Sequence, residues 1–414
     1  MKKLILFLIA ALFFFEGGMS KVWAQETTTS GYLRNYTGIL LKDDNDFAIM
    51  QDTLDLSIEH SKGQVAFKAN VYIHNYPNAE QEIDIRQSYM DIYLDAVDIR
   101  IGKQQVIWGK ADGVSITDVI SPKDMREYIL PDFEEIRLGI QALKIDYYLG
   151  DNTIEMVWVP VFTRNTMPDE DSIWYIQPDF LITPTFDYSK KDVTSDLKSS
   201  EVFVKFSGIT SVIDYEFMIG YMWDDDPTMH VQKTIDPATG QLSAITVTPE
   251  HHPLKLTGGS FSTAAGGSVI RGEAAYYEGK YFRSDDPTLA DGVVEKEYIH
   301  VLLGLDFTIW GIKTSLQLID QQIQDYDEQI LNDKNENTVT FLISKDFLRE
   351  TLHLEMFSYF DLNNDGSLLR PKISYDLIDG FNIIAGFNIF NGKVGKFGQY
   401  DDNDMIYSKI KYSF

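Results

Sequence analysis

The stretch Ile406-Tyr407-Ser408-Lys409-Ile410-Lys411-Tyr412-Ser413-Phe414 ends the chain, and its side chains alternate in character. One face is mostly apolar and aromatic: it carries Ile406, Ile410, Tyr412 and Phe414, with Ser408 between the two isoleucines. The opposite face is mostly polar: Tyr407, Lys409, Lys411 and Ser413. A period of two residues predicts a β-strand with one face in an apolar environment.

The same period recurs along most of the chain, with four clear examples at 64–73, 214–223, 299–307 and 381–389. About 18 such stretches can be counted, each roughly long enough for a tilted strand to cross a membrane, although 16 strands are possible. These stretches predict an all-β protein that forms a single transmembrane antiparallel up-and-down β-barrel.

The connections between these stretches alternate between short and long. Short links fall at 61–63, 96, 150–152, 208–210, 265–267, 310–311, 347–349 and 379–380. Longer, often acidic links fall at 41–46, 76–83, 108–133, 164–197, 224–252, 283–296, 326–336, 361–366 and 391–402. Short periplasmic turns and long outer loops produce this alternation in barrels. The last strand should therefore pair with the first, near Tyr32–Leu40, so that no edge is exposed.

Residues 1–24 read as an export signal, because Lys2 and Lys3 precede the apolar run Leu4–Phe15 and Ala24 offers a cleavage site. A retained membrane anchor is the alternative, but the run is short for a spanning helix. The expected barrel then comprises residues 25–414. The last alternating strand, which ends on the aromatic Phe414, resembles the C-terminal signal that bacterial outer-membrane barrels present to their assembly machinery.

Composition excludes several classes of function. The first 24 residues carry three Lys and one Glu, so the remainder carries 33 basic and 62 acidic residues, a net charge of −29. That balance argues against nucleic acid as a partner. The chain has no Cys and hence no thiolate chemistry. Acidic clusters in the long links could bind divalent cations that bridge to lipopolysaccharide, but solvated loops are the favoured explanation for them.

One segment carries a specific pattern: Gly102-Lys103-Gln104, Trp108-Gly109, Asp112-Gly113 and then Asp118-Val119-Ile120-Ser121-Pro122-Lys123-Asp124. It resembles the segment of a large bacterial family of outer-membrane barrels of unassigned function, which is similar to alginate-export-type, porin-like barrels. The resemblance implies a barrel in a Gram-negative outer membrane and transport of small or hydrophobic compounds.

Residues 108–133 are expected to fold into the lumen. Ser121 as cap and Pro122 at the first helical position predict a short helix from 122 to about 128. Charged residues here would narrow the pore as rings of charge do in selective channels. The predicted constriction consists of Lys103, Trp108, Lys110, Asp112, Asp118, Lys123, Asp124, Arg126 and Glu127. A loop that only caps the barrel or stabilises its wall is the alternative.

The leading functional hypothesis is a channel for small solutes with no catalytic residues, cofactor or metal. The alternatives are an outer-membrane barrel enzyme, lipid-acting or proteolytic, and an exported surface β protein. The sequence lacks HExxH and GxSxG motifs. His300 and His353 lie on polar faces of expected strands, and the adjacent His251-His252 could contact a metal, but no third ligand is evident. Expected partners are the small-molecule solute, outer-membrane lipid, lipopolysaccharide and the assembly machinery.

Overall fold

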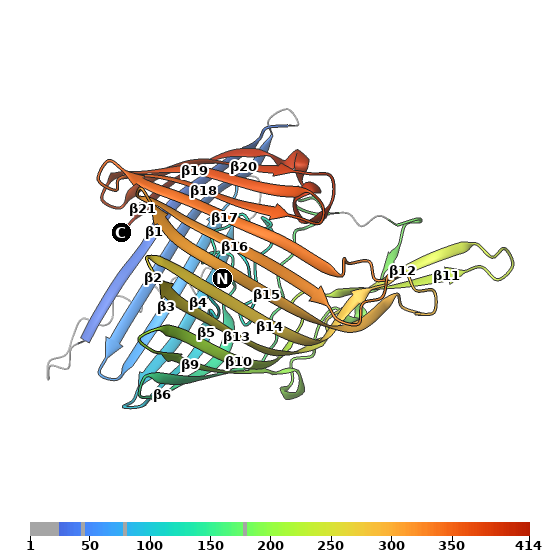
Figure 1. Ribbon diagram of the computed structural model, residues 1–414, viewed down its shortest axis with the longest axis horizontal. Helices are drawn as coiled ribbons and strands as arrows, with labels where there is room; N and C mark the ends of the chain where they lie inside the picture. The colour runs from blue at the N-terminus through green and yellow to red at the C-terminus, as the bar shows by residue number, and fades with distance from the viewer. Residues whose placement is uncertain (1–24, 43–45, 78–80, 177–179) are drawn as a thin grey trace.

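The computed structural model describes residues 25–42, 46–77, 81–176 and 180–414. The predicted export signal and its cleavage after Ala24 therefore lie outside the described residues. Eighteen strands form one sheet (Figure 1). They are β1 (Gln25–Leu40), β2 (Phe47–Lys62), β3 (Val65–Asn75), β4 (Glu82–Tyr93), β5 (Val97–Gln104), β6 (Ile140–Leu149), β7 (Asn152–Val159), β9 (Glu201–Ile209), β10 (Ile213–Trp223), β13 (Pro253–Ala265), β14 (Ser268–Arg283), β15 (Val293–Ile309), β16 (Ile312–Ile323), β17 (Asn335–Phe347), β18 (Leu352–Asp361), β19 (Gly366–Ile378), β20 (Phe381–Asn391) and β21 (Met405–Ser413).

Other elements are small and lie in the long connections. A second sheet consists of β8 (Thr185–Phe186), β11 (Thr228–Ile235) and β12 (Leu242–Glu250). The helical turns are η2 (Tyr188–Lys190), η3 (Leu197–Ser199), α2 (Gly395–Gly398) and η4 (Asp401–Asn403). Helix accounts for 3% of the protein. No helix in the described part of the chain has the length and apolar character needed to cross a membrane.

The 18-stranded sheet closes on itself. Every barrel strand pairs antiparallel with its neighbours in the chain, and β21 pairs with β1 from Tyr32↔Ser413 to Leu40↔Met405. Closure gives each strand two partners, so the barrel presents no unpaired edge. The fold predicted from the sequence, an antiparallel barrel of about 18 strands whose last strand meets the first, is confirmed.

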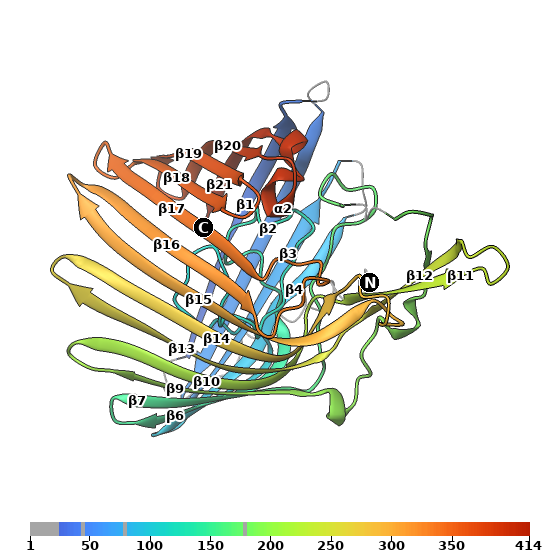
Figure 2. The ribbon, with the colours of Figure 1, turned by 45° about the vertical axis from the view of Figure 1, so that its right-hand side comes forward.

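The connections have the predicted alternation with one exception. Eight of them, between β2 and β3 and then between every second pair of barrel strands, are two to four residues long. The link predicted as long at 361–366 is short as well, because only the four residues 362–365 join β18 to β19. One of these turns is Gly266-Gly267, whose positive φ angles of 59° and 96° suit a two-residue hairpin. The long connections gather at the opposite end, where the hairpin of β11 and β12 projects beyond the barrel (Figure 2).

The outer surface of the wall is apolar. Exposed side chains on the strands include Phe67, Ile85, Ile101, Trp158, Phe217, Ile219, Leu303, Leu318, Phe360, Ile383 and Ile406. They alternate with polar residues that point inward, such as Asn70, Glu155, Lys205, Glu273 and Gln317, all of them buried. An outward apolar band and a polar interior are the arrangement of a barrel that sits in lipid.

The connection between β5 and β6 enters the lumen, but its predicted helix at 122–128 is wrong. Lys123 and Asp124 instead form β-bridges with Arg137 and Thr166, and Tyr128 has a φ of 54°, outside the right-handed helical range. The Ser121 hydroxyl does not cap a helix, because it accepts from the Val106 N–H (2.8 Å) and donates to the Val106 carbonyl (3.0 Å). Bridges to other segments have replaced the local helical bonds.

Barrel closure can be tested by cross-linking in this cysteine-free chain. Thr37 and Ser408 are directly paired across β1 and β21, so a Thr37→Cys/Ser408→Cys variant should form an intramolecular disulfide on oxidation. The product should migrate faster than the reduced chain on a denaturing gel. Thr37→Cys/Tyr412→Cys, four residues out of register, is the matched control and should not cross-link. Equal yields for the two variants would contradict the pairing.

Candidate functional site in the barrel lumen

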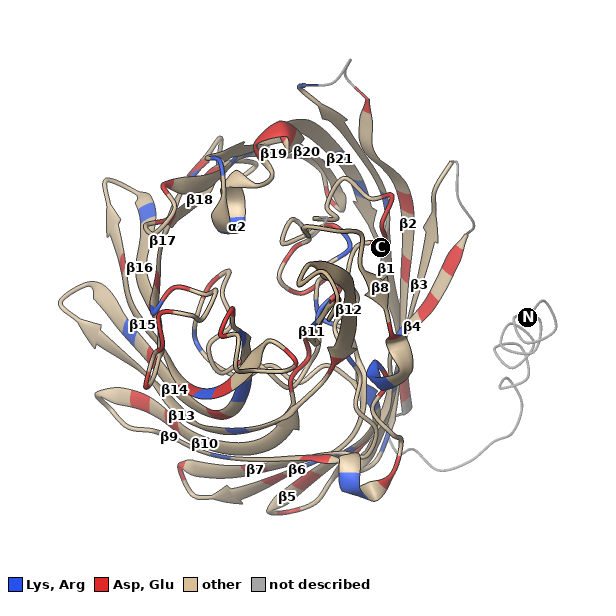
Figure 3. Ribbon diagram, turned by 90° about the vertical axis from the view of Figure 1, so that its right-hand side faces the viewer, with Lys and Arg blue, Asp and Glu red and all other residues tan. Residues whose placement is uncertain are grey.

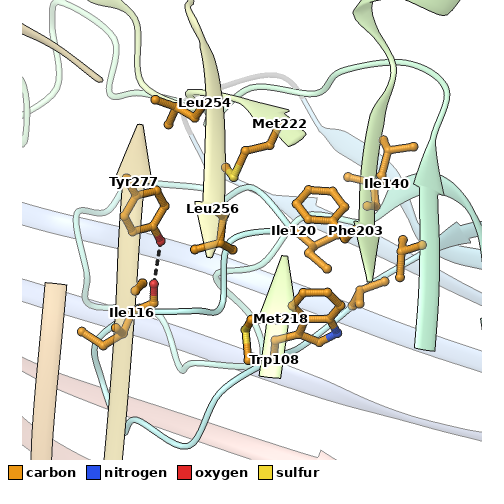
Figure 4. Packing of buried hydrophobic residues seen from close by; sticks show 14 of the residues in the cluster. Trp108, Ile116, Ile120, Ile140, Phe203, Met218, Met222, Leu254, Leu256 and Tyr277 are labelled. Atoms are coloured by element: carbon orange, nitrogen blue, oxygen red, sulfur yellow. Dashed lines mark hydrogen bonds between the residues drawn. The ribbon is translucent and has the colours of Figure 1, made fainter. Parts of the chain in front are cut away.

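The insert, residues 105–139 between β5 and β6, fills one side of the lumen through an apolar core. Its buried residues are Val106, Trp108, Ile116 and Ile120, and Ile116 has no exposed surface. They pack against inward-facing wall residues from β6 through β16: Ile140, Ala142, Val157, Val159, Phe203, Met218, Met222, Leu254, Leu256, Ala275, Tyr277, Leu302 and Ile319 (Figure 4). These contacts seat the insert against this half of the inner wall, and a second buried apolar cluster, which includes Leu130 of the insert, packs against β1 and β18–β21.

Trp108 anchors the start of the insert. Its ring meets Phe203 edge-on at 5.9 Å between centroids, with the Lys205 ammonium 5.0 Å from the indole ring. The indole N–H donates to the Glu155 carboxylate, and the backbone N–H of Trp108 donates to Asp118 Oδ1 at 3.2 Å. An aromatic body buried in an apolar contact, with its single polar atom satisfied, is a stable arrangement for tryptophan.

The Glu273 carboxylate on β14 holds the next turn of the insert. It accepts hydrogen bonds from the backbone N–H groups of Lys110 and Ala111 and from the Thr117 hydroxyl. Gly109 lies so close that a Cβ there would stand 2.8 Å from a Glu273 oxygen, and its φ of 86° also favours glycine. These contacts explain the Trp-Gly pair of the sequence pattern.

Other wall side chains satisfy most of the remaining backbone groups of this turn. Gln317 accepts from the N–H of Asp112 (3.1 Å) and donates to its carbonyl (2.9 Å). Further donors from the wall are Arg271 to the Lys110 carbonyl (2.7 Å), Tyr359 to that of Gly113 (2.9 Å) and Tyr277 to that of Ile116 (2.6 Å). A segment without regular secondary structure can be buried only when its polar backbone atoms find such partners.

A buried ion pair fixes the middle of the insert. Arg137 donates through Nε (2.8 Å) and Nη2 (2.5 Å) to Asp118 Oδ2, and both side chains are less than a tenth exposed. Asp118 also accepts from Trp108. Both partners are engaged, which avoids the large cost of an isolated buried charge.

Two of the cavities in the described part of the lumen adjoin the insert, and the stretch from Met125 to Glu135 contributes to both. The first, of about 590 Å³, is lined by charged residues of both signs: Arg34, Arg86, Arg126, Lys409, Asp124, Glu127, Glu135 and Asp171. The second, of about 480 Å³, is lined in the same way by Lys123, Arg370, Lys372, Lys409, Asp112, Asp132, Asp226 and Glu355. The view along the barrel shows chain segments that lie inside the ring of strands (Figure 3).

Wall arginines hold the stretch that contributes to both cavities. Arg34 donates to both oxygens of Glu135 at 2.7 Å, and Arg370 donates to the carbonyls of Ile129 (3.3 Å) and Leu130 (2.6 Å). Arg86 bonds the carbonyl of Glu134 in the same way. Since guanidinium groups present several donors in a rigid fork, they suit this task better than lysine would.

Burial alters the ionisation of two side chains of the insert. Glu127 lies in the first cavity, where burial raises the pKa of its carboxyl to about 7, although Lys409 and Arg34 oppose the shift. Burial also lowers the pKa of the Lys123 ammonium, against the attraction of Asp118 and Asp225. Glu127 therefore changes charge near neutral pH inside the lumen.

The sequence profile of the family described as "Protein of unknown function (DUF1302)" matches residues 76–376, which is more than half of the chain and includes the whole insert. The chain belongs to the DUF1302 family. A search of curated proteins gave no match.

This DUF1302 protein resembles solved outer-membrane barrels in fold. OccK1 (OpdK) of Pseudomonas aeruginosa superposes with a TM-score of 0.53 at 9% identity, over 94% of this chain and 98% of that one. OccAB2 of Acinetobacter baumannii gives 0.53 at 10% identity, over 94% and 98%. OccK2 (OpdF) of P. aeruginosa, solved with glucuronate, gives 0.52 at 11% identity, over 94% and 97%. At such identities the likeness establishes the barrel architecture alone.

The nine residues predicted to form a constriction do not share one environment. Lys123, Asp124, Arg126, Glu127 and Asp112 line the cavities. Trp108, Lys110 and Asp118 contact the wall or the core of the insert, and the Lys110 ammonium lies 3.5 Å from Glu216. Lys103 stays in β5 and pairs with Asp84 of β4 at 3.0 Å. The constriction itself stays a prediction.

Several lumen residues of this DUF1302 protein escaped the sequence analysis because they lie in the wall. Arg34, Arg86, Arg370 and Lys409 come from β1, β4, β19 and β21, yet all four line the cavities. Their signal in the sequence is weak: a basic residue at the inward position of an otherwise alternating strand. Only the fold shows that the four converge.

The histidines considered for catalysis offer no support for an enzyme. His353 bonds the carboxylates of Asp346 (2.7 Å) and Asp376 (3.3 Å), and no hydroxyl group is among its hydrogen-bond partners in the described part of the chain. His300 lies on β15 and has no hydrogen-bond partner among the described side chains. A serine nucleophile activated by either residue would need such a contact.

The hold of Glu273 on the insert can be measured by hydrogen exchange. Glu273→Ala leaves buried donors unsatisfied at a cost of about 1–3 kcal/mol each, so the amides of residues 109–117 should exchange at least about tenfold faster. Glu278→Ala, on the same strand, removes only an exposed ion pair with Lys255 and is the control. Unchanged protection in the Glu273 variant would show that the core contacts suffice without this carboxylate.

Proposed function

We propose that this protein is a channel through which small polar solutes diffuse across the outer membrane of a Gram-negative bacterium. The observation that carries the proposal is a closed barrel whose lumen retains two cavities lined by charges of both signs. The apolar outer surface supports a position in lipid. A barrel that served only as a scaffold would not need cavities lined by charged side chains in its lumen.

The lining of the cavities favours solutes that carry a carboxylate. Each cavity presents at least three basic side chains, and guanidinium groups recognise carboxylates through paired hydrogen bonds. Among proteins of similar fold, OpdK has been solved with vanillate and OccK2 with glucuronate. The acidic residues interleaved with the basic ones would keep binding weak enough for the solute to leave, as conduction requires.

Selectivity in this proposal is set where the insert approaches the opposite wall. Arg126 stands there, bonded to Asp124 (2.6 Å) and to Glu82 of β4 (3.0 Å). Because Arg126 already binds two carboxylates, a solute carboxylate would have to compete with them for its guanidinium group. The insert is held by fixed wall bonds, so the aperture is expected to be stable rather than to open and close with each solute.

The proposal includes partners at the membrane. The exposed apolar band would contact outer-membrane lipid, and Phe414 would serve the barrel assembly machinery. Exposed acidic groups in the long connections, such as Asp401 and Asp402 of η4, could bridge through divalent cations to lipopolysaccharide. Neither a catalytic role nor a cofactor is part of the proposal.

Conductance in planar bilayers tests the channel directly. Purified, folded wild-type protein should give discrete current steps. Arg126→Ala removes a positive charge from the first cavity, so the permeability ratio of cations to anions should rise by up to about fivefold. Lys233→Ala, which removes an exposed charge on the β11–β12 hairpin, should behave as wild type. Absence of current from heat-modifiable, folded barrels would refute the proposal.

Glu127 should make the selectivity depend on pH. Because the pKa of its carboxyl is raised to about 7, the group is mostly neutral at pH 6 and mostly ionised at pH 8. The preference for cations should therefore increase from pH 6 to pH 8, and Glu127→Gln should remove that increase. Glu328→Gln, exposed in the connection between β16 and β17, is the control. An equal pH response in the Glu127 variant would assign the effect to another group.

A further inference from the structure

A group of histidine and carboxylate side chains lies away from the cavities, where the β11–β12 hairpin joins the barrel. His230 comes from β11, Glu250 ends β12, and His252 directly precedes β13. The antiparallel register places Glu250 opposite Thr228, two residues from His230 and therefore on the same face of the hairpin. The turn back into the barrel then brings His252 to this face as well.

The potential ligand atoms of the three side chains converge. His230 Nε2 lies 2.8 Å from His252 Nε2 and 3.9 Å from Glu250 Oε2, and all three atoms lie within 4.8 Å of one another. In a tetrahedral zinc site with bonds of about 2.0–2.1 Å, neighbouring ligand atoms are about 3.3 Å apart. For the two separations that involve His230, changes of roughly half an ångström would give that spacing.

Neighbouring residues orient the two imidazoles. Asp291 Oδ2, in the connection between β14 and β15, lies 3.0 Å from His230 Nδ1. A carboxylate that accepts a hydrogen bond from Nδ1–H keeps the proton on that nitrogen and leaves the Nε2 lone pair directed at His252, which is the usual arrangement around a metal-bound histidine. His252 is stacked on the Tyr281 ring at 3.8 Å between centroids, and this contact fixes its plane.

We propose that His230, His252 and Glu250 form a binding site for a transition-metal ion of the zinc class. Two imidazole nitrogens and one carboxylate oxygen are a ligand set suited to Zn²⁺, with a fourth position for water. Ca²⁺ and Mg²⁺ prefer oxygen ligands throughout and are disfavoured here. Two Nε2 atoms that face each other need a shared proton or a metal ion between them, and the nearby carboxylate favours the cation.

The proposed ion would tie the hairpin to the rim of the barrel. The Asp291 carbonyl already accepts from the Val231 N–H at 2.7 Å, so the connection between β14 and β15 holds β11 by backbone and by side chain. A bound ion would add a link from β11 to the start of β13. The position of the hairpin at the long-loop end would then depend on metal supply.

Lys190 would compete with the proposed ion for the Glu250 carboxylate. Its ammonium lies 2.9 Å from Glu250 Oε2, so a metal must displace this partner to use the carboxylate. Lys190 is well exposed, and its ion pair is correspondingly weak. Removal of its charge should make the metal bind more tightly, an effect not expected if the cluster only stabilises the hairpin.

Calorimetric titration of ZnCl₂ into tag-free, full-length protein in detergent tests the site. Wild type should bind one Zn²⁺ per chain, and His230→Ala and His252→Ala should each weaken that binding at least about 100-fold. Lys190→Ala should strengthen it, and Asp291→Asn should weaken it by about 10- to 100-fold. His60→Ala, in β2, is the matched control and should bind as wild type.

Heat-modifiable migration on gels shows that each variant is folded before titration. Wild-type protein that takes up no Zn²⁺, or histidine variants that bind as tightly as wild type, would overturn the proposal. If Glu250→Gln left the affinity unchanged, Glu250 would be excluded as a ligand and the three-residue site with it. Zinc binding does not require conduction, so failure of the channel hypothesis would leave this result intact.

Discussion

The hydrogen bonding of the insert by inward wall side chains is the constraint on which the rest of the structure depends. Residues 105–139 contain no helix and no strand beyond isolated bridges, so their backbone satisfies itself only in part, through bonds such as that from the Leu138 N–H to the Pro122 carbonyl. Glu273, Gln317, Arg271 and Arg370 supply the missing partners from β14, β16 and β19. A buried backbone group without a partner costs as much as a lost hydrogen bond. The polar side chains at these wall positions are therefore already engaged in hydrogen bonds to the insert, and a solute would have to compete for them.

The same constraint gives the inner wall a mixed chemistry. From β6 to β16 it carries apolar residues such as Phe203 and Met218, which pack against the insert, and polar residues such as Glu273, which bond its backbone. Toward β1, β4, β19 and β21 it carries the basic side chains that line the cavities. A second buried apolar cluster on this side includes Phe390 of the wall and Leu130 of the insert. The lumen thus combines apolar packing on both sides with charged cavities beside the insert.

Much of the fold could be read from the sequence because a period of two and the length of connections are local properties. The strands, their alternating turns and the pairing of β21 with β1 all followed from them. The helix expected at 122–128 failed because the good capping residues Ser121 and Pro122 meet stronger partners from distant segments. Local preference was overridden by tertiary contacts.

The residues that line the lumen and the histidine cluster were harder to predict from the sequence, because they too depend on contacts between distant segments. Arg34 and Arg370 are separated by most of the chain, and the nearness of His230 to His252 depends on how the hairpin of β11 and β12 returns to the barrel. The adjacent pair His251-His252 gave a hint, but His251 turns away and bonds the Asp224 carbonyl at 2.7 Å. Juxtapositions across strands become visible only once the register is known.

The distance in sequence between the insert and its partners has a consequence for how the barrel is made. Tyr359, Arg370 and Gln317 lie more than 200 residues after the groups they bind. The insert therefore emerges early in synthesis and must wait, without these partners, until strands as late as β19 are in place. Contacts of such separation form slowly. Assembly must then wrap the wall around the insert, so that the final seam of β1 and β21 seals a lumen already occupied.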